Sequence, residues 1–356
     1  MTAKTALAAD ALLARESAPW QTQLRNAVRS VSALLDSLNL TPADVEHGEP
    51  KTRGEDAERA AQDFPVRAPQ SFIDRMRPGD PNDPLLRQVL AVSAEQQHVP
   101  GYVEDPLQER DANPTPGIVH KYQGRLLLMP TAACAVHCRY CFRRHFPYAD
   151  NRLDEGALDR AMDYLASQPE VTEVILSGGD PLILDDAALG RLIDRLESLG
   201  HLSRLRIHSR LPVVLPDRLT EALAERLDAS RLSTSLVLHG NHPAEIDAGL
   251  TERLQRWRPA SLTLLNQSVL LAGVNDDPAV LIALSERLFE AGVLPYYLHL
   301  LDPVAGVGHF AVADEQALAI YRQMAAKLPG YLLPKLAREL PDLPSKTTYG
   351  LDTLAG

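Results

Sequence analysis

Cysteine is nearly absent from this 356-residue chain. Its three cysteines all fall within one short run, Cys134-Ala-Val-His-Cys138-Arg-Tyr-Cys141. No thiol is left elsewhere to form a pair, which excludes a framework of structural disulfides. Thiols confined to one site suit a reducing compartment, so we expect a cytoplasmic location.

Several other features are missing. No apolar run approaches the roughly 18 residues of a membrane-spanning helix, and the first residues do not resemble a signal peptide. No internal repeat has a solenoid period. The net charge of −11 argues against a broad nucleic-acid-binding face. We therefore expect a protein that binds neither membrane nor nucleic acid, with a large core arranged as two domains or as one barrel with an extension.

The first part of the chain is expected to be helical. Apolar residues recur at helical spacing between Leu24 and Leu38. A proline-rich stretch, residues 105–117, predicts an extended connector. We accordingly divide the chain into a helical N-terminal region and connector (1–115), a core (116–330) and a short C-terminal segment (331–356).

From about His120 onward, short apolar runs alternate with helical patterns. Strands are expected at residues 125–130, 173–177, 205–209, 232–238, 261–265 and 294–299. Helices are expected to begin near Asp186, Asp217, His242, Asp277 and Asp314. Six such units predict an α/β fold with a parallel sheet, in the form of a partial (β/α)6 barrel open on one side. Functional residues of such a barrel lie at the carboxyl ends of the strands.

The cysteine run follows the first of these strands. A [4Fe–4S] cluster is usually held by four thiolates, and with three thiolates one iron keeps an open position for a small molecule. Two alternatives remain at this point. A structural zinc site could be completed by His137 or His145, or the cysteines could be ordinary buried thiols.

Polar residues follow the next strands. Ser177-Gly178-Gly179-Asp180-Pro181 ends the second strand. Its glycines allow the backbone to approach a ligand, and its carboxylate can accept a hydrogen bond from an ammonium group, although a plain turn is an alternative. The later strands end near Ser209, Arg210, His239, Asn241 and Gln267. Each could cap a helix, but together they predict one ligand pocket.

The Cys-x-x-x-Cys-x-x-Cys spacing resembles the radical S-adenosylmethionine (SAM) family, in which the open iron of the cluster binds SAM. The runs His239-Gly-Asn241-His-Pro and Asn266-Gln-Ser-Val-Leu-Leu resemble its lysine 2,3-aminomutase branch. The resemblance implies that the cluster is bound by Cys134, Cys138 and Cys141. It also implies cofactor contacts from Gly178, Gly179, Asp180, Ser209, Arg210, His239, Asn241 and Gln267.

The same resemblance implies a second cofactor, pyridoxal 5′-phosphate (PLP), which needs a lysine for a Schiff base. Lys346 lies as far from the first cysteine as the family's PLP lysine does, so we expect it to be the catalytic lysine. Lys335 is the second candidate. Lys121 and Arg125 match the basic positions on the PLP side, the first being arginine in the family.

The expected substrate contacts come from the same comparison of motifs. Arg143 matches the arginine that pairs with the lysine carboxylate, although a surface or cluster-supporting arginine is an alternative. Asp302 matches an aspartate that holds the distant ammonium group. Glu339 stands where the family has a second aspartate, and this longer carboxylate leaves another amino acid, such as glutamate, open as the substrate.

Within this family, the chain most resembles a branch of shorter enzymes. The runs at residues 79–84, 138–147 and 344–346 and the cysteine-free tail are its features. That branch converts (S)-α-lysine to (R)-β-lysine, which a separate ligase attaches to elongation factor P. The resemblance implies an isomerase that needs an external electron donor, and a homodimer is a further expectation. A zinc-stabilised binding protein on a barrel-like scaffold is the alternative from another class.

Overall fold

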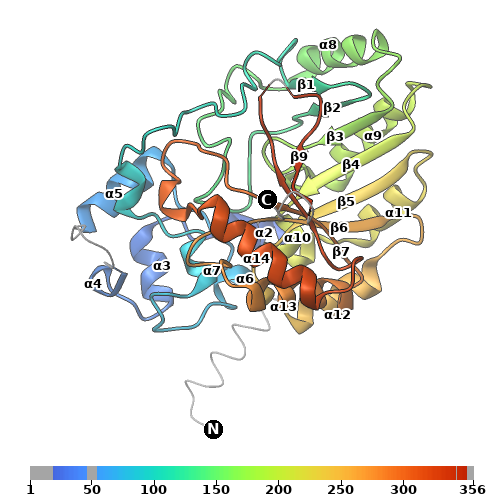
Figure 1. Cartoon of the computed structure of the whole chain (residues 1–356). Helices are drawn as coiled ribbons and strands as arrows, with labels where there is room; N and C mark the ends of the chain where they lie inside the picture. Colours follow the sequence, from blue (N-terminus) through green and yellow to red (C-terminus); the bar gives the residue numbers. More distant parts are fainter. Residues whose placement is uncertain (1–18, 46–53, 342, 351–356) are drawn as a thin grey trace.

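The computed structural model describes residues 19–45, 54–341 and 343–350, and a single sheet lies at its centre (Figure 1). Within this part of the chain the strands lie side by side in sequence order. The seven strands from the second to the eighth are parallel, whereas each edge strand is antiparallel to its neighbour. The strands are β1 (Ile118–Tyr122), β2 (Arg125–Leu128), β3 (Glu173–Leu176), β4 (Arg204–Ser209), β5 (Ser233–His239), β6 (Thr263–Val269), β7 (Leu294–His299), β8 (Lys335–Arg338) and β9 (Thr347–Thr348).

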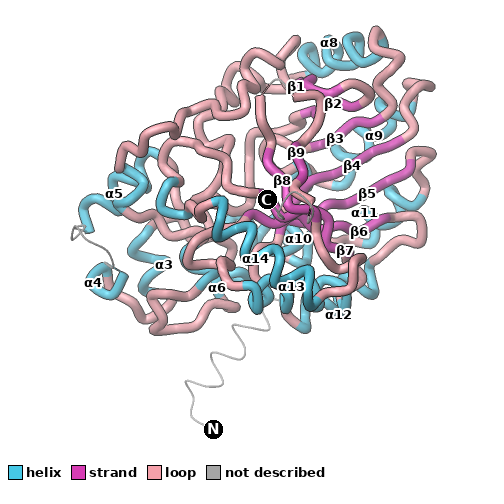
Figure 2. Tube along the Cα trace, viewed as in Figure 1, coloured by secondary structure: helices cyan, strands magenta, loops and turns pink. Residues whose placement is uncertain are grey.

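Helices connect the parallel strands and cover the outside of the sheet (Figure 2). Most begin at an aspartate or threonine whose side chain accepts a backbone N–H of the first turn, which is why they start where they do. The main connecting helices are α8 (Glu155–Ala166), α9 (Asp186–Glu197), α11 (Glu221–Asp228), α12 (Ala248–Trp257), α13 (Pro278–Glu290) and α14 (Asp314–Lys327).

The expected α/β fold is confirmed, with differences in detail. The helices expected from Asp217 and His242 begin later, at Glu221 and Ala248, because short 3₁₀ turns precede them. Strand β6 continues beyond the expected boundary to Val269. Strand β8 adds a parallel strand, so residues of the C-terminal segment belong to the same sheet.

The helical spacing of apolar residues from Leu24 to Leu38 predicts one continuous helix, and this prediction is wrong. The structure has two short helices there, α2 (Trp20–Arg25) and α3 (Val31–Ser37). Val28 lies between them and pairs in an antiparallel bridge with Ala68, which interrupts the helix. The other helices of this region are α4 (Pro42–Val45), α5 (Gly54–Asp63), α6 (Gln70–Ile73) and α7 (Pro84–Arg87).

Alternate residues of the parallel strands form the core. Leu126, Val174, Leu205 and Leu236 are almost fully buried and belong to one apolar cluster with the connecting helices. The connector at residues 105–117 contains neither a helix nor a strand, but turns make up most of it where an extended segment was expected. Among the described helices, none combines the length and the apolar character that crossing a membrane would require.

Candidate functional site

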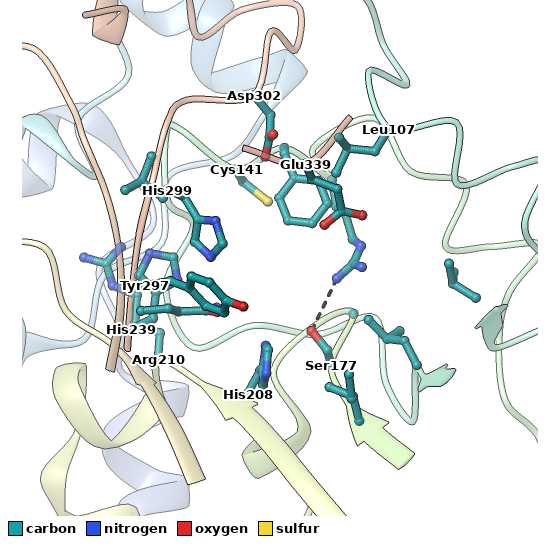
Figure 3. Close-up of a pocket in the computed structure, with 18 of the residues that line it drawn as sticks. Leu107, Cys141, Ser177, His208, Arg210, His239, Tyr297, His299, Asp302 and Glu339 are labelled. Carbon is teal, nitrogen blue, oxygen red and sulfur yellow. Dashed lines mark hydrogen bonds between the residues drawn. The ribbon is translucent and has the colours of Figure 1, made fainter. Parts of the chain in front are cut away.

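A cavity of about 510 Å³ lies within the curved sheet, toward the carboxyl ends of its strands. The cysteine loop, the ends of β3 to β7 and the segment after β8 all contribute to its wall. Figure 3 shows Asp302, Glu339, His299 and His208 around one space. The predicted site residues that line the cavity are Lys121, Arg125, Cys134, Cys138, Cys141, Arg143, Gly178, Gly179, Asp180, Ser209, Arg210, His239, Gln267, Asp302, Glu339 and Lys346. Asn241 does not line it.

The three cysteine side chains share one wall of this cavity. Burial, together with the nearby Cys138 thiolate, raises the pKa of the Cys141 thiol to about 11. A bound cation stabilises the thiolate form of these clustered thiols, because it offsets the repulsion between their negative charges.

The histidines of the zinc alternative are engaged elsewhere. The Nδ1 atom of His137 lies 2.7 Å from the carbonyl of Pro65, and Nε2 of His145 lies 3.1 Å from the carbonyl of Ala305. The ring of His137 also stacks on Phe64. Three thiols without a fourth protein ligand fit a [4Fe–4S] cluster with one open iron.

A buried network of ion pairs holds the cysteine loop against the N-terminal region. Arg139, between two cysteines, donates to Glu95 through Nε at 2.9 Å and Nη2 at 2.5 Å. Arg144 donates to the same carboxylate at 2.8 Å. The side chains of Arg139 and Glu95 have no exposed surface. The loop is therefore held by a carboxylate from the N-terminal region.

The glycines after β3 hold the loop from the other side. Gly178 has a φ of +109°, and a Cβ there would lie 2.6 Å from the Met129 side chain. A Cβ on Gly179 would lie 2.5 Å from the backbone oxygen of Ala133, just before the first cysteine. Only glycine allows this approach, which lets Asp180 N donate to Ala133 O at 2.8 Å.

The Asp180 carboxylate is already occupied by protein donors. It accepts the Ser209 hydroxyl at 2.7 Å and the backbone N–H groups of Leu182, Arg210 and Leu211 at 2.9 to 3.0 Å. Burial raises the pKa of Asp180, although these hydrogen bonds oppose the shift. The carboxylate thus joins the ends of β3 and β4 and is not a free acceptor.

Arg210 connects a cysteine to a buried polar network. Its Nη1 donates to Cys138 Sγ at 3.0 Å, and its Nη2 donates to Gln88 at 2.8 Å and Glu245 at 3.2 Å. Asn241 lies behind the cavity wall, where it donates to Gln88 and to the Tyr140 hydroxyl. The buried Nε of Arg210 has no partner within the described residues. A cationic donor beside a cysteine sulfur suits an anionic cluster.

Charged residues face the cysteines across the cavity. Glu339 accepts a hydrogen bond from Lys121 at 2.5 Å and another from Lys346. Burial opposes ionisation of Glu339, but the two ammonium groups outweigh it and lower the pKa of Glu339 to about 2. Burial raises the pKa of Asp302 to about 7, with Glu339 adding to the shift and Lys346 opposing it. Two lysines, Lys121 and Lys346, and two carboxylates, Glu339 and Asp302, therefore share this side of the cavity.

These side chains also fit a phosphate-bearing aldehyde cofactor. Lys346 supplies an amine inside the cavity, and Lys121 and Arg125 supply nearby positive charge. The guanidinium of Arg125 lies 4.3 Å from the ring centre of Tyr122. No ammonium group other than those of Lys121 and Lys346 is present in the described lining of the cavity.

Arg143 is paired within the protein. Its Nε and Nη2 atoms each donate to Glu109 at 2.7 Å, which occupies the side edge of the guanidinium. Its Nη1 atom points to the Ser177 hydroxyl at 3.3 Å, the contact dashed in Figure 3. Burial opposes the charge of Arg143, but Glu109 outweighs it and raises its pKa. Nη2 keeps a second N–H on the end edge of the guanidinium, next to the Nη1 atom that contacts Ser177.

Sequence reasoning missed several lining residues. His208 and His299 lie at strand ends, so the rule that selected Ser209 and His239 also points to them. Burial, together with the charge of Lys346, lowers the pKa of His299 to about 3. Burial also lowers the pKa of His208. Glu109 comes from the connector, where no pattern indicates a functional residue.

Comparison with known proteins agrees with this geometry. Residues 128–238 match the profile of the radical SAM superfamily. The L-lysine 2,3-aminomutase of Haemophilus influenzae is 48% identical over 94% of this chain and 96% of that protein. That of Escherichia coli strain K12 is 48% identical over 93% of this chain and 94% of that protein. That of Clostridium subterminale is 33% identical over 92% of this chain and 77% of that protein.

Replacing Gly179 with alanine should prevent assembly of the cysteine site. The new Cβ would collide with backbone, which must shift, at a cost of about 1–3 kcal/mol for overpacking. We expect the Gly179→Ala protein to fold but to retain little iron after anaerobic reconstitution, measured by iron and sulfide analysis. Gly249→Ala, whose Cβ meets nothing closer than 3.5 Å, is the control. Equal iron content in both variants would contradict this account of the glycine.

Proposed function

Because the chain belongs to the lysine 2,3-aminomutase family of radical SAM enzymes, we propose that it converts (S)-α-lysine to (R)-β-lysine by moving an amino group from C2 to C3. The observation that supports this most directly is that Lys346 and the three cysteines line one cavity. A hydrogen-abstracting radical and the group that carries nitrogen must reach the same carbon atoms, so both cofactors need a shared space.

Members of this family use a [4Fe–4S] cluster, SAM and PLP. When bound, the cluster and SAM supply the radical, and PLP supplies the group that carries the nitrogen. In our proposal Cys134, Cys138 and Cys141 hold the cluster and Lys346 holds PLP. The protein orients the reacting atoms and keeps water out of the cavity.

We assign the PLP-side positive charge to Lys121 and Arg125. The SAM side is assigned to the elements after β3, β4, β5 and β6, which carry Gly178, Gly179, Ser209, His239 and Gln267. Asp180 and Asn241 position these elements, because their polar side-chain atoms are bonded within the protein. Arg210 positions Cys138 through its N–H donor.

We propose that the substrate spans the cavity from Arg143 to Asp302. The remaining N–H of Nη2 on the end edge of the Arg143 guanidinium suits the lysine carboxylate, with Glu109 fixing the orientation of the fork. Asp302 suits the distant ammonium group. Glu339 is already bonded to Lys121 and Lys346, so we assign it first to these lysines.

The decisive experiment is anaerobic incubation of the reconstituted enzyme with lysine, SAM, PLP and dithionite, followed by chiral chromatography. We expect (R)-β-lysine, and we expect none from Lys346→Ala or Cys138→Ala. Mass spectrometry alone cannot detect the reaction, because the two lysines are isomers. Cleavage of SAM without β-lysine would refute the lysine substrate, and incubation with glutamate would then test the other amino acid.

The proposal for Asp302 predicts a pH dependence. Its pKa of about 7 in the free protein means that the carboxyl is protonated below pH 7 and loses its attraction for an ammonium group. The value of kcat/KM for lysine should therefore fall about tenfold per pH unit below this pKa. In Asp302→Asn this decline should disappear and kcat/KM should be low throughout. A decline that persists unchanged in Asp302→Asn would assign it to another group.

The proposal for Glu109 predicts a change in substrate affinity. In Glu109→Gln the guanidinium of Arg143 loses its ionic partner and its fixed orientation, so the KM for lysine should rise about tenfold or more. SAM cleavage in the absence of lysine should be unchanged, which separates a positioning effect from misfolding. An unchanged KM would exclude this role for Glu109.

We also propose that the product serves elongation factor P, because the short-branch runs that resemble this chain belong to enzymes with that role. Purified factor, its ligase, ATP and the chromatographed product should give a factor heavier by one lysyl residue, detected by intact-protein mass spectrometry. Failure of the ligase to prefer the product over α-lysine would refute this link without affecting the isomerase activity.

A further inference from the structure

A pair of like charges lies at the surface beside the cysteine loop. Val28 and Ala68 form an antiparallel bridge through two backbone hydrogen bonds, of 2.9 and 3.0 Å. In antiparallel pairing the residue after one partner faces the residue before the other, so Arg29 lies opposite Arg67. Arg29 is exposed and Arg67 is partly buried.

This pair adjoins the loop that carries the cysteines. The backbone N–H of His137 donates to the carbonyl oxygen of Arg67 at 3.0 Å, and His137 lies between Cys134 and Cys138 in the sequence. We call Arg29 and Arg67 the basic edge. Ala132 and Ala133, which precede Cys134, are also exposed. The basic edge is therefore a surface next to the cluster ligands.

The charge of the basic edge is not neutralised. Burial and then Arg29 lower the pKa of Arg67, and the Cys134 thiolate opposes the shift. No ion pair joins Arg29 or Arg67 to a carboxylate in the described ranges. By contrast, the deeply buried arginines each have a carboxylate partner: Arg139, Arg143, Arg210 and Arg218.

Like charges facing each other across a bridge destabilise it, so packing does not explain this pair. We propose that the basic edge is the docking surface for a small acidic protein that delivers one electron to the cluster. The donor is oxidised by one electron and the oxidised cluster is reduced by one. The net charge of −11 repels such a donor from most of the surface, so a local positive edge would orient its approach. The inference rests on the cluster and not on the lysine substrate.

The test measures electron transfer directly. Reconstituted holoenzyme is mixed in a stopped-flow instrument with an acidic flavodoxin in its fully reduced form, and cluster reduction is followed by absorbance at several salt concentrations. We expect Arg29→Glu to lower the bimolecular rate at low salt by about tenfold and to flatten its salt dependence. Arg29→Lys should retain most of the rate. Arg191→Glu, an equal charge change at an exposed position of α9, should have little effect.

Turnover driven by saturating dithionite separates a docking defect from a damaged enzyme. Arg29→Glu should make β-lysine at the wild-type rate with dithionite and more slowly with flavodoxin. Equal slowing by Arg29→Glu and Arg191→Glu, or slowing by neither, would overturn the proposal. If the wild-type protein makes no β-lysine with dithionite, the proposed function fails, and the flavodoxin kinetics still decide the docking surface.

Discussion

The buried carboxylate of Glu95 is the contact on which the cysteine loop depends. It receives hydrogen bonds from Arg139 and Arg144, one within the cysteine run and one just after it. Glu95 itself belongs to a short turn in the N-terminal region (Ser93–Gln96). Removing one partner of such a buried pair typically costs about 3–5 kcal/mol, because the remaining charge has no water to solvate it. The N-terminal region is thus a structural part of the site.

The parallel sheet could be predicted because each strand carries its own signal. Short runs such as Arg125–Leu128 and Glu173–Leu176 are apolar in the middle, and aspartate or threonine caps mark the helices that follow. Strand β8 carries no such signal, since Lys335 and Arg338 stand at its ends. The break in the helix at Val28 could not be predicted from the neighbouring residues either, because its cause is pairing with the distant Ala68.

The cavity residues could be predicted from position, but their contacts could not. The rule that parallel strands present functional groups at their carboxyl ends selects Ser209, His239 and Gln267 correctly as lining residues. Asn241 satisfies the same rule but lies behind the wall, because its amide is bonded to Tyr140 and Gln88. The partners Glu95 and Glu109 come from distant segments, and a single sequence gives no sign of such pairing.

The contact between Lys121 and Glu339 has a consequence for the order of folding. The two residues are 218 positions apart in the sequence and come from strands near opposite edges of the sheet. Closing so long a loop costs conformational entropy. The strands between the two residues offset this cost once they have assembled into the sheet, so the contact forms late. On the ribosome, the cysteine run emerges long before Glu339 and Lys346. The cysteine loop therefore exists for a time without its opposite wall, and during that time its thiols are open to both cluster delivery and oxidation.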